Sequence, residues 1–396
     1  MMLEEVTVLD LTRVLAGPYC TQLLSDLGAT VIKIESVVGD DTRSWGPPFV
    51  DGESAYYLST NRGKKSVVVN LKDERGRSLV SRLAMDADVL VENFKTGDLV
   101  RYGLDYQTLQ GHNPQLVYTS ITGFGQTGPR AAEPGYDASI QGLVGLMAMT
   151  GEKNGGPTKI GVAWVDVLTG VHAATGILAA LYERNRTGKG RYLDIALFDV
   201  ALASMVNQAQ ATLLTGQAPV PLGSGHPSLV PYQAFLAREG SLVIAVGNDT
   251  QFTSLCEVLD ITQLASDARF ATNESRVEHR EVLVGKLESA FLRRDRDDWI
   301  ERLRAAGVPV TPVNTLPEAL GDPQVAARHM VSEIIHPTVG PIPMVGSPFG
   351  KVASRRSAPP YLGQHTREVL EGTLGLTRQE IDGLIQDSVV GSDTKD

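Results

Sequence analysis

The sequence has few of the residues that build metal, redox or disulfide centres. Its 396 residues include two cysteines, Cys20 and Cys256, which lie far apart in the chain. The seven histidines form no H-E-x-x-H or similar ligand pair. We therefore expect no metal site, and two buried thiols in a reducing compartment.

Features of membrane, exported and nucleic-acid-binding proteins are also missing. No stretch reaches the roughly 18 uninterrupted apolar residues of a membrane span. The N-terminal "MMLEEVTVLDLTRV" is acidic where a signal peptide would be basic. The net charge of −10 argues against nucleic acid, whose binding proteins usually present a basic face. We expect a cytoplasmic protein that binds neither membrane nor nucleic acid, although a local cluster such as "NRGKK" (61–65) could hold a small anion.

The common nucleotide and hydrolase motifs are absent as well. The loop after the first predicted strand, "LTRVLAGPYC", has one glycine, Gly17, where a dinucleotide site needs G-x-G-x-x-G. Neither a P-loop nor a G-x-S-x-G elbow occurs. We therefore expect neither NAD nor ATP as a cofactor.

What is present is an alternation of strands and helices. A strand pattern at 6–12, a helix at 17–29 and a strand at 30–35 form a βαβ unit, which requires a parallel sheet. The same alternation continues through segments at 65–71, 74–87, 88–94, 115–125 and about 166–185. The sequence predicts an α/β fold with a Rossmann-like large domain, and its length predicts a second, smaller α+β domain.

One acid stands in an apolar helix pattern. The stretch "GVAWVDVLTGVHAATGILAALYERN" (161–185) carries Asp166 where the apolar packing begins. From spacing alone, Asp166 is an N-cap residue, because aspartate is favoured there.

Seven stretches in a fixed order resemble the class III CoA-transferase family, the group of formyl-CoA transferase, carnitine CoA-transferase and the α-methylacyl-CoA racemases. They run from residue 8 to about 366: "VLDLTRVLAGPYCTQLLSDLGATVIKIE", "NRGKKSVVVNLKDERG", "VLVENFKTG", "GFGQTGPRAAEPGYDASIQG", "DVLTGVHAATGILAAL", "TGKGRYLDIALFD" and "PPYLGQHT". The pieces "GHPSLVPYQAF" (225–235) and "VGNDTQF" (246–252) resemble the branch that moves CoA between dicarboxylic acids, such as the succinyl-CoA:glutarate and itaconate transferases.

The resemblance implies an interlocked homodimer whose chains pass from a large domain to a small domain and back. Together with the Pro- and Gly-rich texture after residue 205, it implies five consecutive parts. These are the N-terminal part of the large CoA-binding domain (1–205), a linker (206–225), the small domain (226–330), a second linker (331–350), and a return to the large domain (351–396) that ends in a mobile tail.

The resemblance also implies a covalent mechanism on Asp166. A carboxylate attacks the thioester of an acyl-CoA donor such as succinyl-CoA, and CoA passes through an aspartyl anhydride and thioester to an acceptor carboxylic acid. Neither ATP nor a metal is needed, and CoA is a substrate. Asp137 could orient Asp166 or raise its pKa through like charge, and Gln141 could donate to the anhydride. A capping position and a catalytic role are compatible for Asp166.

Two other functions remain open. The racemase branch has a histidine where Tyr136 stands, and tyrosine, with a pKa near 10, would be a poor substitute for it. A catalytically lapsed CoA-binding dimer is the second alternative. For Tyr136 and Gln141, ordinary helix packing and capping is an equal interpretation.

The resemblance assigns CoA binding to Val14, Lys72, Asn93, Phe94 and Arg101. Ser36 stands where formyl-CoA transferase has a phosphate-binding arginine, and Arg43 could replace it. The stretch "LGSGHPS" (222–228) matches a mobile loop over the active site, or it is a plain solvent loop. In this loop, Gly223 and Gly225 would supply flexibility, and His226 and Ser228 could contact the distal carboxylate of a dicarboxylic acid.

Overall fold

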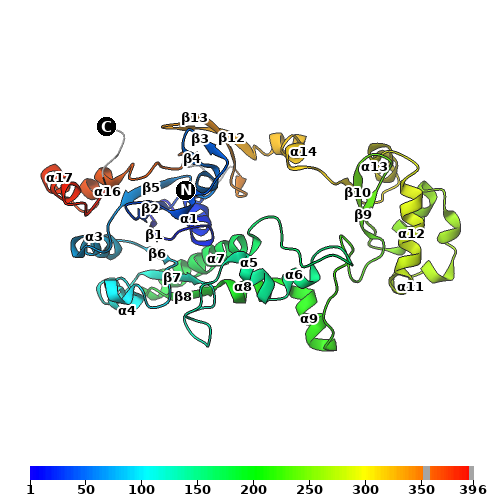
Figure 1. Ribbon diagram of the computed structural model, residues 1–396, viewed down its shortest axis with the longest axis horizontal. Helices are drawn as coiled ribbons and strands as arrows, with labels where there is room; N and C mark the ends of the chain where they lie inside the picture. The colour runs from blue at the N-terminus through cyan, green and yellow to red at the C-terminus, as the bar shows by residue number, and fades with distance from the viewer. Residues whose placement is uncertain (351–356, 392–396) are drawn as a thin grey trace. The chain divides into compact units, whose positions relative to one another are not determined.

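The computed structural model describes residues 1–350 and 357–391, and they form two compact units (Figure 1). Unit 1 contains Met1–Val144, Ile160–Gly216 and the described residues from Pro323 onward. Unit 2 contains Gly145–Lys159 and Gln217–Asp322. The chain therefore enters unit 2 twice and ends in unit 1.

Unit 1 is built on a six-stranded parallel sheet, which confirms the α/β prediction. The strand order is β5 (Lys64–Val68), β2 (Thr30–Glu35), β1 (Thr7–Leu11), β6 (Val89–Glu92), β7 (Val117–Thr122) and β8 (Tyr192–Ala196). The four central strands are buried along almost their whole length, as expected for a parallel sheet covered on both faces. The order reverses direction between β1 and β6, so the loops after these two strands open a crevice.

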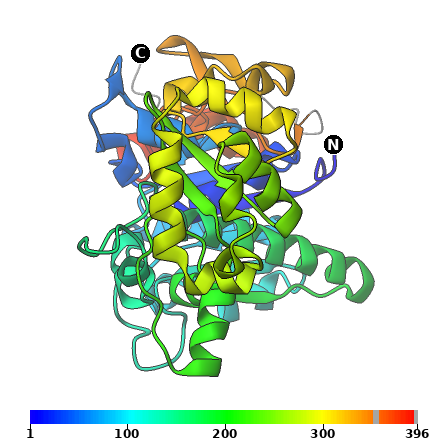
Figure 2. The same cartoon turned by 90° about the vertical axis from the view of Figure 1, so that its right-hand side faces the viewer.

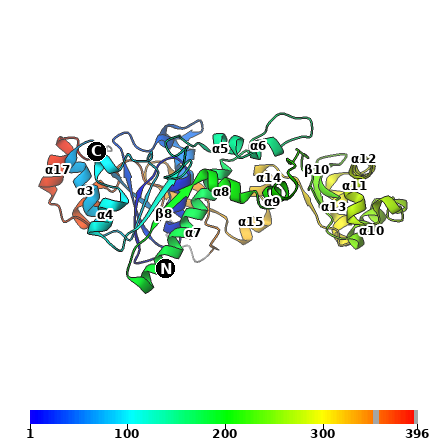
Figure 3. The same cartoon turned by 90° about the horizontal axis from the view of Figure 1, so that it is seen from below.

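Helices cover both faces of the sheet (Figure 3). One face is covered by α1 (Ala16–Asp26), α5 (Asp137–Leu143), α7 (Trp164–Thr187) and α8 (Leu197–Ser204), and the other by α3 (Glu74–Met85), α4 (Tyr106–His112), α16 (Thr366–Gly372) and α17 (Arg378–Gln386). The helix α7 packs very closely on α1 at Gly170, where a Cβ would lie 2.6 Å from the carbonyl oxygen of Ala16. This close contact fixes the start of α7 beside the crevice.

The helix α7 is also long and apolar enough to cross a bilayer by length and composition alone. Its mean hydropathy reaches 1.4 over 18 residues, of which 44% are buried inside the structure. A core helix of a soluble protein passes the same test, and α7 packs against α1, α5 and the sheet.

Two C-terminal segments are more ordered than the sequence indicates. Residues 331–350, expected to be a linker, contain the hairpin β12 (Val331–His336) and β13 (Gly340–Val345). The polar tail was expected to be mobile, but Val389 and Val390 are buried, and Val390 forms a β-bridge with Val69. That expectation is wrong for residues up to 391, while residues 351–356 and 392–396 lie outside the described residues.

Unit 2 has a core of its own. Its antiparallel sheet has the order β11 (Val310–Pro312), β10 (Ser241–Ala245) and β9 (Tyr232–Leu236). Around it pack α10 (Asp249–Val258), α11 (Asn273–Glu278), α12 (Arg280–Phe291) and α13 (Arg296–Ala305), with Phe252, Phe291 and Trp299 in the core (Figure 2).

Short elements in both units complete the described chain. They are β3 (Phe49–Val50), β4 (Glu53–Ser54), α2 (Ala55–Thr60), α6 (Leu146–Met149), α9 (Val206–Thr215), α14 (Leu316–Leu320) and α15 (Pro323–Ala327), with short 3₁₀ turns at Asp41–Ser44, Val100–Tyr102, Thr262–Leu264 and Ala268–Phe270.

Candidate active site

Two adjoining cavities lie at the carboxyl ends of the parallel strands in unit 1. The first, here called the Asp166 cavity, has a volume of about 200 Å³. It is lined by Asp166 and by the loops after β1, β6 and β7, including Arg13, Val14, Asn93, Phe94, Lys95, Thr122 and Tyr136. The second, called the Lys72 cavity, has a volume of about 570 Å³ and shares Arg13 and Phe94 with the first. Both open at the crevice where the strand order reverses, the usual ligand position in such sheets.

Asp166 lies in the first turn of α7 but does not cap that helix. The helix begins after Ala163, which offers no side-chain cap. Asp137, the first residue of α5, caps α7 instead, because its Oδ2 accepts hydrogen bonds from Val165 N at 2.8 Å and from Asp166 N at 3.3 Å. The interpretation of Asp166 as the N-cap residue is therefore wrong, and its carboxyl group is left facing the cavity.

Gln141 holds the capping aspartate in place. Its Nε2 donates to Asp137 Oδ1 at 2.6 Å, and its Oε1 accepts from Ile160 N at 3.0 Å. Both carboxylate oxygens of Asp137 are thus hydrogen-bonded inside the protein. Gln141 is fully buried and is not among the residues that line the Asp166 cavity.

The pKa of Asp166 is strongly shifted. Burial, and then the negative charge of Asp137, raise the pKa of Asp166 from 3.8 to about 7. Near neutral pH the carboxyl group is therefore divided between its acid and its carboxylate. Such a poorly solvated carboxylate beside a cavity is typical of a reacting group.

Tyr136 reaches the cavity from the turn before α5. The turn approaches β7 closely, since a Cβ on Gly135 would lie 2.3 Å from the Cα of Gly123. Tyr136 is 65% exposed and lines the Asp166 cavity, directly before the buried Asp137. The structure thus brings Tyr136, Asp137 and Asp166 together, as the sequence comparison within the family implied.

Sequence reasoning missed Tyr56, on α2. Burial, followed by the charges of Asp166 and Asp137, raises the pKa of Tyr56 to about 12. Its phenol therefore stays neutral near the two carboxylates, although Tyr56 is not among the residues that line the Asp166 cavity. Its ring packs edge-on against Trp45 at 5.1 Å. No motif marks Tyr56 in the sequence, because its nearness to Asp166 arises only from the fold.

The loop after β1 holds a strained residue at the mouth of the crevice. Val14 has a φ of 72°, a region that a β-branched residue rarely occupies. The loop is held by Asn93, which bonds the backbone N and O of Arg13 at 2.9 and 2.8 Å, and by Lys33, whose ammonium donates to Thr12 O at 2.8 Å. Strain of this kind persists where the surroundings enforce it, as they do at ligand sites.

The proposed CoA contacts fall around both cavities. Val14 and Asn93 line the Asp166 cavity, Phe94 lines both, and the exposed Lys72 lines the Lys72 cavity. Arg101 lines neither cavity and pairs with Asp98 at 2.7 Å. Asp98 itself lines the Lys72 cavity, so Arg101 lies at its border.

Arg43 is not free to replace the missing arginine at Ser36. Its guanidinium donates to both carboxylate oxygens of Glu35 at 2.8 and 2.7 Å, to Tyr57 Oη at 2.6 Å and to Pro360 O at 3.1 Å. These partners leave it no role as a phosphate ligand. Ser36 does line the Lys72 cavity.

The loop at 222–228 belongs to unit 2 and is anchored there. Arg280 donates to the carbonyl oxygens of His226 and Pro227, and the His226 ring stacks on Tyr232 at 5.3 Å. Ser228 N donates to His226 Nδ1, and Gly223 has a φ of 60°, which suits glycine. Contact of Gly223, Gly225, His226 or Ser228 with a substrate stays a prediction.

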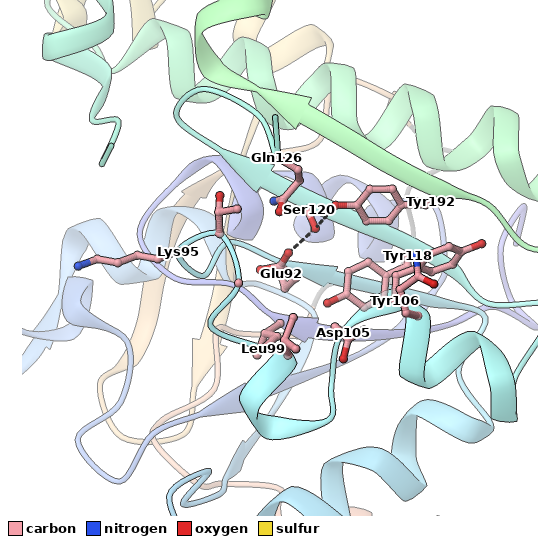
Figure 4. Close-up of a pocket in the computed structure, with 13 residues that line it drawn as sticks. Glu92, Lys95, Leu99, Asp105, Tyr106, Tyr118, Ser120, Gln126 and Tyr192 are labelled. Atoms are coloured by element: carbon pink, nitrogen blue, oxygen red, sulfur yellow. Dashed lines mark hydrogen bonds between the residues drawn. The ribbon is translucent and has the colours of Figure 1, made fainter. Parts of the chain in front are cut away.

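A third pocket of about 230 Å³ is lined in part by the segment that follows β6 (Figure 4). Glu92 lines it, is 5% exposed, and accepts hydrogen bonds from Ser120 Oγ and from Phe94 N. Tyr192 donates to Ser120 Oγ at 3.2 Å. Burial raises the pKa of Glu92 to about 7, so the carboxyl group is partly protonated near neutral pH.

Glu92→Gln should therefore change stability in a pH-dependent way. The pKa of Glu92 in the folded protein lies above the usual 4.5. The side chain therefore contributes fully to the free energy of unfolding below pH 4.5, and this contribution is lost as pH rises through about 7. Between pH 5 and pH 8, the free energy of unfolding of the variant should rise relative to that of the parent protein by up to about 3 kcal/mol. Urea unfolding of both proteins at the two pH values measures the difference. An equal difference at both values would contradict the buried, partly protonated Glu92.

Both cysteines are buried free thiols, as the sequence predicted. Burial raises the pKa of Cys256 to about 12, and Cys20 is buried as well. Within residues 1–350 and 357–391, no three histidine, cysteine or acidic side chains gather as a metal site would require. The absence of a metal cofactor stays a prediction.

Comparisons with known proteins give a consistent result. The family model described as "CoA-transferase family III" matches residues 3–366. The chain is 44% identical to the succinate–glutarate CoA-transferase of Agrobacterium fabrum, covering 93% of this chain and 94% of the relative. It is 44% identical to the succinyl-CoA:glutarate CoA-transferase of Mus musculus (98% and 90% covered) and 39% identical to the succinyl-CoA:mesaconate CoA-transferase of Haloarcula marismortui (93% and 96%).

Solved structures agree with the sequence comparisons. A CAIB/BAIF family protein from Brucella suis is 45% identical, with a TM-score of 0.84 over 93% of this chain and 98% of that one. A protein from Mycobacterium tuberculosis is 30% identical, with a TM-score of 0.81 over 92% and 98%. The likeness extends over both units.

Proposed function

The chain belongs to CoA-transferase family III and is a CoA-transferase, and we propose that it moves CoA from succinyl-CoA to a dicarboxylic acid through a covalent intermediate on Asp166. One observation carries this proposal: the carboxyl group of Asp166 lines a cavity and has a raised pKa, and it is left free of capping because Asp137 caps α7. The dicarboxylate class rests on the names of the relatives, which act with succinyl-CoA and glutarate or mesaconate.

The proposed reaction balances without water or an added proton. The ionised Asp166 attacks the thioester carbonyl carbon, the C–S bond breaks, and a mixed anhydride and the CoA thiolate result. The thiolate then attacks the Asp166 carbonyl carbon and releases succinate, which leaves an aspartyl-CoA thioester. The acceptor carboxylate repeats these steps in reverse, and Asp166 leaves as a carboxylate.

We place the CoA along the two cavities, with Val14, Asn93 and Phe94 beside its thiol arm and Lys72 at its phosphates. Lys72 suits this role because it is exposed, and no carboxylate of the described chain lies within salt-bridge distance of it. Arg101 is a secondary candidate because it must first leave Asp98. Gln141 and Asp137 act in this proposal by positioning Asp166.

Lys72→Ala should raise the KM for acyl-CoA by about tenfold and leave kcat nearly unchanged, since a phosphate contact is the same before and in the transition state. Steady-state kinetics with varied acyl-CoA measures the split. Lys189→Ala is a matched control, because Lys189 is an exposed lysine beyond the far end of α7. A fall in kcat at constant KM would remove Lys72 from the CoA site.

The experiment that tests the function is a transfer assay. The protein is incubated with succinyl-CoA and, in turn, glutarate, itaconate, malate and mesaconate, and the acyl-CoA products are separated by chromatography. New acyl-CoA and free succinate in equal amounts support the proposal. Exchange of the α-proton in heavy water without transfer would support the racemase instead. CoA binding without either reaction would identify a lapsed enzyme.

We also propose a homodimer, interlocked as the family resemblance implies, in the cytoplasm and without a membrane or nucleic-acid partner. Support for a dimer comes from α9, in which no residue is buried although Val206, Leu213 and Leu214 are strongly exposed apolar side chains. Contiguous exposed apolar surface is typical of an interface.

A further inference from the structure

A dicarboxylic acid needs a cation for the carboxylate that does not react. One end of the acid must meet Asp166, and the other enters the same partly desolvated space, where an unpaired charge is costly. Among the described residues that line the Asp166 cavity, two carry positive charge, Arg13 and Lys95. We propose that Arg13 binds the distal carboxylate, and this inference rests on the proposed function.

The backbone of Arg13 is fixed while its guanidinium is free to change partner. Asn93 bonds both the N and the O of Arg13, and the next residue, Val14, is held in its strained conformation. The side chain of Arg13 is 52% exposed and makes one 3.1 Å contact, with Asp41, which is 50% exposed. The anchor point is therefore precise in position, and the charged end remains accessible.

The pair with Asp41 is one that a substrate can replace. Exposed ion pairs of this kind contribute little to stability. A free carboxylate can offer the guanidinium two parallel hydrogen bonds, where Asp41 makes one. Asp41 also lines the Asp166 cavity, so it occupies the cation until an anion enters and disfavours anions that cannot bind Arg13.

Lys95 is the weaker candidate for the same role. It is exposed, it forms no salt bridge within the described chain, and it lies on the segment between the Asp166 cavity and the pocket of Glu92. Figure 4 shows its side chain extending away from Glu92 and the tyrosines. A flexible ammonium recognises a carboxylate as a point charge, whereas the planar guanidinium matches its two oxygens.

The test compares two five-carbon acids, glutarate and valerate, which differ in the distal carboxylate. In Arg13→Gln, the KM for glutarate should rise roughly 10- to 100-fold. The inhibition constant of valerate against glutarate, and the dissociation constant of free CoA, should stay within a factor of about three. Arg13→Lys keeps the charge, so it should raise the KM for glutarate less than Arg13→Gln does. This second variant keeps the test informative if Arg13→Gln does not fold.

Two further variants complete the design. Asp41→Asn releases Arg13 and should lower the KM for glutarate, the opposite direction from Arg13→Gln. Lys95→Gln should leave the KM for glutarate within a factor of about three of the parent value. A loss of free CoA binding in Arg13→Gln would mean that Arg13 serves the CoA phosphates, and a larger effect in Lys95→Gln would move the subsite to Lys95. Either result overturns the assignment, whereas absence of transfer in the parent protein would reject the proposed function itself.

Discussion

Asp166→Asn should keep its fold and lose CoA transfer, with kcat falling by about four orders of magnitude or more. The amide has nearly the same shape as the carboxyl group but cannot form an anhydride. Because Asp137 rather than Asp166 caps α7, the substitution removes no capping bond. The loss should therefore be chemical and not structural.

Intact-protein mass spectrometry checks this result directly. The parent protein is incubated with succinyl-CoA, trapped with hydroxylamine or borohydride, and compared with Asp166→Asn and Asp166→Ala. We expect a modification at Asp166 in the parent protein and none in either variant. A modification that survives in both variants would place the nucleophile elsewhere. An unfolding midpoint of Asp166→Asn at or above that of the parent protein is the control for the fold, because the neutral amide removes the repulsion from Asp137.

Asp137→Asn should have the second-largest effect, a loss of about 100-fold in kcat/KM together with a shifted pH profile. An asparagine at 137 can still accept from Val165 N through its oxygen. Its NH₂ group then meets the NH₂ group of Gln141, whose oxygen is already used by Ile160 N. Two donors would face each other in a buried position, so the start of α7 would lose its defined geometry.

The direction of the pH shift follows from the charge that is removed. Asp166 must be ionised to attack, and its pKa is about 7, so the rate of the parent protein should rise with pH through that value. Without the negative charge at 137, the pKa of Asp166 falls, although its burial remains. The acid limb of kcat/KM should therefore move to lower pH. Gln141→Ala keeps the charge and should slow the enzyme without moving the limb, and an unmoved limb in Asp137→Asn would contradict the coupling.

The sheet and the reacting residue could be predicted from the sequence because their signals are local. Each strand is a short apolar run, and alternation with helices leaves few topologies for a parallel sheet. Asp166 stands out as one acid in an apolar helix pattern, and the ordered family motifs supply its chemistry.

The features that the sequence did not predict depend on contacts between distant segments. Asp137 caps a helix that begins 27 residues later, at Trp164, so local capping rules pointed to the wrong aspartate. Arg43 was a candidate phosphate ligand until Glu35 and Tyr57 proved to occupy it. Val389 and Val390 are two apolar residues in a polar tail, and only their pairing with the segment after β5 explains their burial.

The contact between Asp137 and the start of α7 has a consequence for which form of the enzyme accumulates. In the empty enzyme, two carboxyl groups compete for one partly desolvated place, and ionisation of both is disfavoured. Conversion of Asp166 to an anhydride or a thioester makes that side chain neutral and removes the repulsion between the two carboxylates. Asp137 keeps its hydrogen bonds to the start of α7. The acylated enzyme is thus electrostatically more relaxed than the free one. In the presence of acyl-CoA and without an acceptor acid, the protein should stand mostly in its loaded form.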